Sequence, residues 1–217
     1  MSTVASGTRR GIRLGLSPDQ AARLTALKTA ERIQDFVNAL AWNYETDGPT
    51  ADSVVQTLAR GSAHCIEGAL VAACALWLAG EPPLLVDLGA ARGDVDHVIA
   101  VFRRNGLWGA ISKSNSPFLR YRDPIHRSLR ELAISFAPQY VKARRKTLRS
   151  YSVPVDLRRH DAALWVTCPG FCRAIVDTLT GARHFAIVPP AAANRLRPID
   201  PIEARANTLR DYPKPPG

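Results

Sequence analysis

One pair of residues in this 217-residue chain has the types and the spacing for nucleophilic chemistry. Cys65 opens the almost wholly apolar run CIEGALVAACALWL, and His97 opens the run HVIAVF about 30 residues later. At a helix start, unpaired backbone N–H groups and the helix dipole favour the thiolate, which lowers the pKa of a cysteine there. A histidine within reach could take the thiol proton and return it to a leaving amine. The pair predicts a Cys-His dyad that attacks a carbonyl group.

A third polar group has to orient the imidazole ring of such a dyad. The segment after the histidine-led run supplies two candidates, Ser112 and Asn115. Asp94 and Asp96 lie just before His97 and could also help. A serine hydroxyl accepts the imidazole N–H but does not stabilise an imidazolium as a carboxylate does, whereas an asparagine amide orients the ring. We expect Ser112 or Asn115 to complete the site.

The residues around this pair have simpler interpretations. His64 is interpreted as a surface residue at the helix start, and Glu67 as an acidic first-turn residue that complements the helix dipole. Cys74, inside the apolar run, is interpreted as part of the core. Cys168 and Cys172 lack the second cysteine pair that a zinc site of this kind requires. We expect no metal and no cofactor.

The scaffold for the two residues can be predicted from the hydrophobic pattern. Ser17-Pro18 is typical of an N-cap followed by the first helical position, and apolar residues recur at helical spacing as far as Asn43. Asn105-Gly106 favours a tight turn between two strands. The predicted elements are helices 18–43, 50–58 and 65–78, a strand 84–88, a hairpin of strands 97–102 and 107–111, and a helix 124–136. They predict an α+β fold: N-terminal helices and a central Cys-bearing helix packed on an antiparallel sheet.

The chain is basic, with 29 Lys and Arg against 19 Asp and Glu. The excess is concentrated in residues 118–160, where 11 basic residues outnumber 3 acidic ones, a local charge of +8. Such a surface attracts polyanions without conferring specificity, so we expect non-specific polyanion binding. The predicted organisation is a flexible basic arm (1–16), a core (17–117), a basic extension packed on the core (118–188) and a Pro/Ala/Arg-rich tail (189–217) that is largely extended or disordered.

Composition excludes several classes of protein. With 46% hydrophobic and 22% charged residues, the chain can bury a core, which excludes the disordered and fibrous classes. The longest uncharged apolar stretch, residues 68–80, is shorter than the roughly 20 residues that span a bilayer. The first 20 residues contain no apolar run of a secretory signal. We expect no membrane segment, a cytoplasmic location and four reduced thiols.

The order of these elements resembles the core of the transglutaminase-like superfamily, which is related to the papain-like cysteine proteases. In that family a Gly-x-Cys motif opens the central helix, a strand follows, and a histidine-led strand turns into a Gly-Trp return strand that ends in aspartate. The corresponding segments here, within residues 17–117, are Gly61 to Cys65, Ala69 to Leu78, Leu84 to Val86, His97 to Phe102, and Leu107 to Ile111 with Trp108. Two positions depart from the family pattern: Ala63 stands at the usual glycine position, and Ser112 stands where the aspartate is expected.

The resemblance implies cysteine-dependent acyl transfer on a peptide or protein amide. Cys65 would form a thioester, His97 would act as acid and base, and backbone N–H groups at the helix start would bind the oxyanion. Water as the acceptor makes the protein a peptidase or amidase, and an amine makes it a transamidase. The alternative function is that of a catalytically inactive member of the superfamily, a basic binding module for an acidic protein or nucleic acid.

Overall fold

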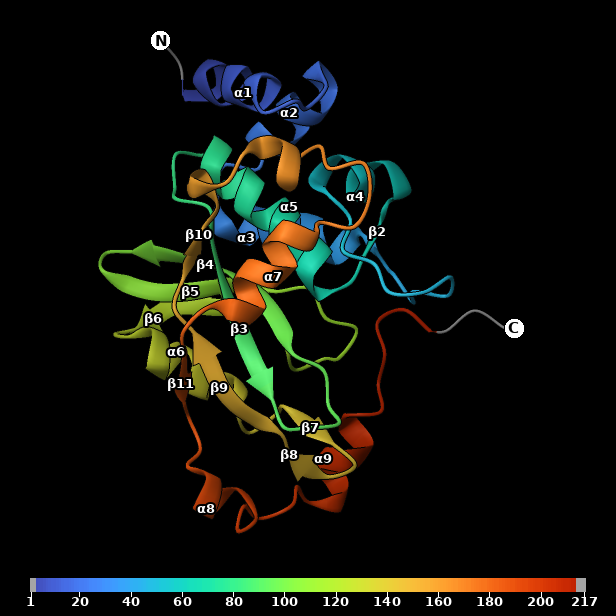
Figure 1. The fold of residues 1–217 in the computed structure, drawn as a ribbon, viewed down its shortest axis with the longest axis vertical. Helices are drawn as coiled ribbons and strands as arrows, with labels where there is room; N and C mark the ends of the chain where they lie inside the picture. The colour runs from blue at the N-terminus through green and yellow to red at the C-terminus, as the bar shows by residue number, and fades with distance from the viewer. Residues whose placement is uncertain (1–2, 214–217) are drawn as a thin grey trace.

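The computed structural model describes residues 3–213 and shows helices packed on both faces of an antiparallel sheet (Figure 1). The helices are α1 (Thr3–Arg13), α2 (Pro18–Thr25), α3 (Ala30–Ala39), α4 (Val54–Arg60), α5 (Cys65–Leu78), α6 (Leu129–Phe136), α7 (Arg173–Gly181), α8 (Pro190–Ala193) and α9 (Pro201–Ala206). The main sheet contains β3 (Leu84–Ala90), β4 (His97–Arg104), β5 (Leu107–Ile111), β6 (Arg122–His126), β9 (Leu148–Ser152), β10 (Val155–Asp156) and β11 (His184–Ala186). Two short ladders lie outside it: β1 (Ala41–Trp42) with β2 (Ser62–Ala63), and β7 (Val141–Lys142) with β8 (Arg145–Lys146).

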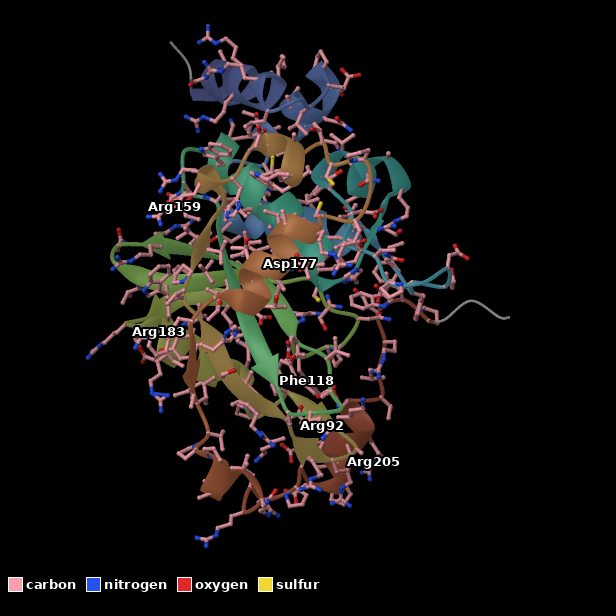
Figure 2. All side chains as sticks on the ribbon, viewed as in Figure 1. Arg92, Phe118, Arg159, Asp177, Arg183 and Arg205 are labelled. Atoms are coloured by element: carbon pink, nitrogen blue, oxygen red, sulfur yellow. The ribbon has the colours of Figure 1, made fainter. Side chains whose placement is uncertain are left out.

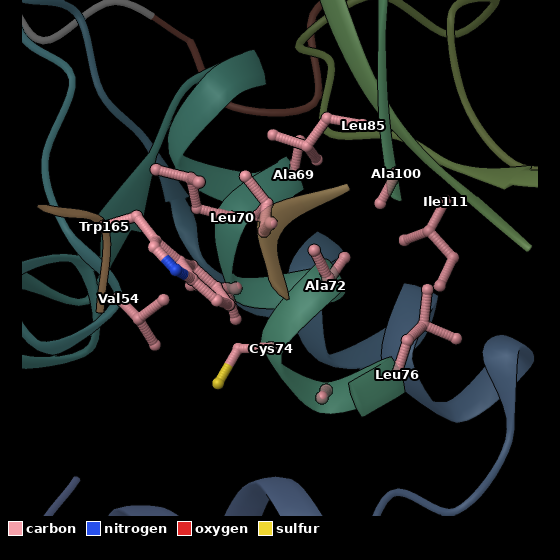
Figure 3. Close-up of a cluster of buried hydrophobic side chains, with 14 of the residues drawn as sticks. Val54, Ala69, Leu70, Ala72, Cys74, Leu76, Leu85, Ala100, Ile111 and Trp165 are labelled. Atoms are coloured by element: carbon pink, nitrogen blue, oxygen red, sulfur yellow. The ribbon is translucent and has the colours of Figure 1, made fainter. Parts of the chain in front are cut away.

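Helix α5 forms the centre of the molecule because it is apolar on nearly every side. Figure 3 shows its side chains directed towards Leu85, Ala100 and Ile111 of the sheet on one side and towards Val54 and Trp165 on the other. The predicted bounds, 65–78, are confirmed. Among the described helices, α5 included, none combines the length and the apolar character needed to cross a bilayer.

The main sheet has the strand order β11-β9-β3-β4-β5-β6, with β10 paired to β3, and every neighbouring pair is antiparallel. Strands β4 and β5 form the predicted hairpin, in which Arg104 pairs with Leu107. Asn105 and Gly106 have φ values of 51° and 81°, as a two-residue turn that matches the strand twist requires. The α+β class with an antiparallel sheet is therefore confirmed.

Side chains alternate along β4 and divide the core into two layers. Val98, Ala100 and Phe102 pack with α5 and the N-terminal helices on one face of the sheet. Ile99 and Val101 pack with α6 on the other face. Because a slip of one residue would exchange the two faces, burial on both sides fixes the register of the strand that begins with His97.

The prediction of one continuous helix over 18–43 is wrong. Helix α2 stops early, Lys28 takes a positive φ of 56°, and the Thr29 hydroxyl accepts the Arg32 N–H as the N-cap of α3. Helices α2 and α3 both bury an apolar face in the core that contains α5. Their apolar residues therefore follow a nearly continuous helical spacing although the chain turns between them.

The arm expected to be flexible over 1–16 contains α1, which packs on the end of α5. A Cβ at Gly7 would lie 2.6 Å from the Leu78 carbonyl oxygen, so the two helices touch through their backbones. The Arg10 guanidinium donates a hydrogen bond to the carbonyl oxygen of Trp77. A basic side chain satisfies an unpaired carbonyl at a helix C-terminus, which explains the position of Arg10 beside the end of α5.

The tail predicted to be extended is also folded over its described part, 189–213. It contains α8 and α9, and Ile199 is buried with its carbonyl oxygen bonded to the Arg144 guanidinium. The segment then returns towards the loop after β1 (Figure 1), where the Tyr44 hydroxyl donates to the Tyr212 carbonyl oxygen. The Tyr212 hydroxyl donates to the Asn38 carbonyl oxygen of α3 over 2.6 Å. Residues 1–2 and 214–217 of the predicted arm and tail lie outside the described residues.

The expected boundary after residue 117 does not divide the sheet. Strands β6, β9, β10 and β11 all come from the segment 118–188, and β9 lies between β3 and β11. The helix predicted over 124–136 begins later, at Leu129 with Ser128 as its N-cap, because the residues before it form β6 beside β5. The described chain is therefore organised around one sheet.

Candidate active site

Cys65 is the first residue of α5, and the chain before it is held on both sides. Gly61 ends α4 in the left-handed region, with φ 71°, and the next two residues form β2 against β1. His64 is then the N-cap of α5. This places the half-buried Cys65 in a first turn whose N–H groups have no intrahelical partner.

Cys65 opens into a cleft of about 340 Å³. The walls come from distant parts of the chain: His97 begins β4, Tyr140 follows α6, and Asn207 and Arg210 follow α9. Three acidic residues also line the cleft: Glu45, Asp94 and Asp96. The fold thus brings the two residues of the predicted dyad into one cleft.

His97 is buried, and its ring is oriented by Ser112. The Nε2 atom lies 2.7 Å from the Ser112 Oγ, which itself lies 2.8 Å from the carbonyl oxygen of Leu119. A carbonyl only accepts, so the hydroxyl donates its proton to Leu119 and accepts the Nε2–H of His97. The Tyr140 ring packs edge-on against the imidazole. The Nδ1 atom of His97 is therefore the nitrogen left to exchange a proton.

Ser112 is fixed in turn by Gln34, a contact that the sequence analysis missed. The Gln34 side chain accepts the Ser112 N–H and donates to the Ser112 carbonyl oxygen, each over 2.9 Å. Gln34 is buried on α3 beside Ile33, in the helix's apolar face. A polar residue inside that apolar stripe is the one sequence signal for this contact. The double hydrogen bond sets where Ser112 meets His97.

The environment of Cys65 favours its thiolate. Burial alone raises the pKa of this thiol, but hydrogen bonding and charge from His64 and His97 outweigh burial and lower the pKa to about 5. Burial raises the pKa of Cys74 to about 12. Burial, with a contribution from nearby Cys168, also raises that of Cys172 to about 12. Cys65 is therefore ionised at neutral pH when these two thiols are not.

His64 lies in contact with the Cys65 sulfur, so its interpretation as a surface residue is wrong. Its Nδ1 atom is 3.8 Å from the sulfur, and its Nε2–H donates to the Thr50 carbonyl oxygen over 3.0 Å. Carboxylate oxygens of Glu45 and Glu67 each lie 3.6 Å from Nε2. With 12% of its side chain exposed, His64 forms part of the cleft wall.

Glu67 supports the wall of the cleft that contains His64. Its fully buried carboxylate accepts hydrogen bonds from the His64 backbone N–H, the Asn43 amide and the Thr50 hydroxyl. It also pairs with Arg60 over 2.8 Å. Burial raises the pKa of Glu67, but the charges and hydrogen bonds of His64 and Arg60 outweigh it and lower the pKa. Besides complementing the helix dipole, Glu67 therefore keeps a negative charge next to His64.

Gly68 allows the chain after β5 to approach the first turn of α5. A Cβ at Gly68 would lie 2.4 Å from the Cβ of Lys113, which leaves no room for a side chain. Lys113 is itself buried, and its ammonium group donates to the carbonyl oxygens of Asn38 and Leu40. This close approach holds Ser112, the residue before Lys113, near the start of α5.

Asn115 does not contact His97. Its side-chain oxygen accepts the Tyr212 N–H over 2.8 Å, and its amide N–H₂ donates to the Tyr212 carbonyl over 2.9 Å and to the Tyr44 hydroxyl over 3.0 Å. These bonds anchor the segment after α9 that lines the cleft. The structure thus places Ser112 against the His97 ring and uses Asn115 as an anchor.

Asp94 and Asp96 line the cleft, but their carboxylates bond to the neighbouring loops. Asp96 accepts the Ala90 N–H over 2.7 Å, and Asp94 accepts the Val95 N–H and the Thr147 hydroxyl. These contacts brace the connection between β3 and β4. The two aspartates thus help to position the start of β4 rather than bond to the His97 ring.

A comparison with models of known protein families gives no match, and a comparison with curated proteins gives none either. Within residues 3–213, no group of three or more His, Cys, Asp or Glu residues is arranged to hold a metal ion.

A second cavity of about 300 Å³ adjoins the cleft, and the two share Gln139, Val141 and Asn207. The other residues around it are mainly apolar: Phe118, Pro138, Ile199, Ile202, Glu203 and Ala206. The apolar cavity and the cleft that contains Cys65 therefore share a wall.

Proposed function

We propose that this protein is a cysteine-dependent acyltransferase that acts on amide bonds of peptides or proteins. One observation carries the proposal: Cys65, with its low pKa, and His97, with its ring held by Ser112, line the same cleft. The chain order of Cys-bearing helix, strand, His-led strand and return strand agrees with the resemblance to the transglutaminase-like core. Ser112 takes the place of the family's aspartate.

In the first half of the reaction, the Cys65 sulfur attacks the amide carbonyl carbon and the C=O π electrons move to oxygen. The N–H groups of Cys65 and Ile66, which have no intrahelical partner, stabilise the oxyanion. His97 enters this step as an imidazolium that carries the Cys65 proton on Nδ1. As the oxyanion re-forms the C=O bond, the C–N bond breaks and His97 donates that proton to the leaving amine. The acyl group remains on sulfur as a thioester.

In the second half, water or an amine gives a proton to Nδ1 of His97 and attacks the thioester carbon. The C–S bond then breaks, and the electron pair returns to sulfur as thiolate. Water yields a carboxylic acid, and an amine yields a new amide. The same residues serve both outcomes, so the acceptor that enters the cleft decides between hydrolysis and transamidation.

The test is incubation of the protein with a peptide library, with and without a small primary amine. We expect cleaved or amine-modified peptides in the mass spectrum and, after acid quenching, an acyl adduct on Cys65. Cys65→Ala and His97→Ala should each abolish turnover. Products that persist in both variants, or a wild-type protein that forms neither adduct nor product, would contradict the proposal.

The alternative, a basic binding module, receives less support because several arginines of the basic segment bond within the protein. The Arg122 guanidinium donates to the Phe118 carbonyl oxygen, and Arg158 pairs with Asp156 over 2.6 Å. In Figure 2, Arg159 of this segment lies apart from Arg183 and Arg205, which belong to later parts of the chain. We expect only weak oligonucleotide binding that salt removes. Tight, sequence-selective binding at about 0.3 M salt, where the Debye length falls below 8 Å, would favour the alternative.

A further inference from the structure

The His64 ring contacts the Cys65 sulfur separately from His97. Because the Thr50 carbonyl accepts the Nε2–H of His64, a neutral ring would carry its one proton there and turn a bare Nδ1 lone pair towards the sulfur, 3.8 Å away. A neutral ring could accept only from a thiol S–H at this nitrogen, and it would repel a thiolate. Because Cys65 is ionised at neutral pH, the contact requires a protonated ring, which donates from both nitrogens and pairs with the thiolate.

The charges around His64 favour the same state. Groups of both signs face this region from the loop after β1, the start of α4, the end of α4 and the first turn of α5: Glu45, Asp52, Arg60, Cys65 and Glu67. Burial lowers the pKa of His64, but its contacts with Cys65, Glu67 and Glu45 raise the pKa to about 9. Arg60 is the one cation among these neighbours, and it is paired with Asp52 and Glu67.

His97 has a different partner. Its Nε2–H meets the neutral hydroxyl of Ser112, which is already bonded to a carbonyl oxygen. A hydroxyl orients the ring without holding a positive charge on it, so His97 can give up a proton and regain it. The two histidines are thus equipped for different tasks: carboxylates lie against His64, and a hydroxyl lies against His97.

We propose that His64 is a second catalytic histidine, which stays protonated and pairs with the Cys65 thiolate while His97 transfers the protons. This inference rests on the proposed acyl transfer. In each cycle the proton that His97 donates to the leaving amine is replaced by one from the incoming water or amine, and the His64 proton does not move. In a Cys-His-Asp site, the carboxylate lies against the histidine that transfers protons. Here the carboxylates lie against His64 instead.

The experiment measures how fast iodoacetamide alkylates Cys65 as a function of pH. His64→Asn removes the charge and keeps a residue that is favoured at an N-cap. We expect the midpoint of the pH profile of Cys65 alkylation to rise by about one pH unit or more in this variant. Alkylation at mildly acidic pH should therefore slow about tenfold. His64→Ser, which also keeps a residue favoured at an N-cap, should raise the midpoint in the same way. An unchanged midpoint in His64→Asn overturns the proposal.

His97→Ala is the matched comparison. We expect it to abolish turnover of an amide substrate while alkylation of Cys65 at mildly acidic pH remains faster than in His64→Asn. A His97→Ala midpoint at or above that of His64→Asn would assign the thiolate charge to His97 and contradict the proposal. Should His64→Asn fail to fold by circular dichroism, His64→Ser decides, and an unshifted midpoint there counts against the proposal. Because iodoacetamide needs no substrate, this result is separate from any failure of the acyl-transfer assay.

Discussion

The Nε2–H of His97 donates to the Oγ of Ser112 over 2.7 Å, where a Cys-His-Asp site would place a carboxylate. The hydroxyl has one proton, and that proton is bonded to the Leu119 carbonyl oxygen. Ser112 is therefore an acceptor of fixed direction. It holds the ring orientation and the tautomer of His97, and it leaves the charge of the ring without a counter-ion at that nitrogen.

Ser112→Ala should slow acylation of Cys65 by an amide substrate roughly tenfold or more, because the imidazole loses its orientation and its tautomer is no longer fixed. The pH midpoint of Cys65 alkylation should rise less than in His64→Asn, since Ser112 acts on the sulfur only through His97 and the His64 contact is unchanged. Single-turnover kinetics and iodoacetamide labelling measure the two effects. Equal acylation rates in Ser112→Ala and wild type would show that the hydrogen bond does not position the ring.

Cys65 should be alkylated well before Cys74 and Cys172 at about pH 6.5, because a pKa of about 5 leaves it ionised there while the others remain thiols. For an acid with a lowered pKa, the thiolate fraction is high above that value and falls as the pH drops through it. Labelling should therefore be almost constant from neutral pH down to about pH 6 and decline near pH 5. Peptide mapping by mass spectrometry measures each site. Faster labelling of Cys172 than of Cys65 would contradict the assignment of the nucleophile.

Asn115→Ala should release the segment that contains Tyr212 without changing the pH profile of Cys65. It removes two hydrogen bonds to the Tyr212 backbone, each worth about 1 kcal/mol, so local opening should increase roughly tenfold or more. Hydrogen–deuterium exchange of residues 207–213 measures the opening. The result would be contradicted by unchanged exchange of this segment or by an altered alkylation midpoint.

Ile202→Glu should reduce the reaction of Cys65 with probes that carry an apolar side chain. Ile202 is exposed on α9 and lines the apolar cavity beside the cleft, so the change alters this wall without disturbing the core. Labelling rates of peptidyl chloromethyl ketones with leucine or alanine next to the reactive group measure the preference. We expect the leucine probe to react several-fold faster in wild type and to lose that advantage in the variant. Iodoacetamide, too small to reach the cavity from Cys65, should react equally with both proteins.

The elements predicted best from the sequence are those fixed by local pattern. Residues 65–78 are apolar all round, which only a buried helix explains, and Asn105-Gly106 specifies the turn of the hairpin through its positive φ values. The positions of Cys65 and His97 follow from these elements, because each is the first residue of one of them.

The parts that the sequence analysis missed depend on contacts between distant residues. Helix α1 and the segment after α9 contain few apolar residues, and they are held by hydrogen bonds to partners far away in the chain, such as Arg10 to Trp77 and Tyr212 to Asn38. Composition predicts a solvated arm for such segments because it does not reveal these partners.

The contacts of the His64 ring could not be predicted from the sequence for the same reason. The sequence places Glu67 three residues away, but the Thr50 carbonyl and the Glu45 carboxylate reach the ring only after the loop between β1 and α4 has folded. A His-Cys pair followed by a glutamate at the third helical position is the local signal, and it becomes informative only with those tertiary contacts. Gln34 has a comparable signal, a single polar residue in a buried helical stripe.

Gly68 makes helix α5 slightly less stable, and it allows the close approach of the chain at Lys113. A glycine inside a helix is less stable than an alanine by about 1 kcal/mol, yet a methyl group here would lie 2.4 Å from the Lys113 Cβ. Any substituent would push apart the helix that begins with Cys65 and the strand end that holds Ser112 against His97. The separation between the Cys65 sulfur and the His97 imidazole is thus set in part by a methyl group that this sequence leaves out.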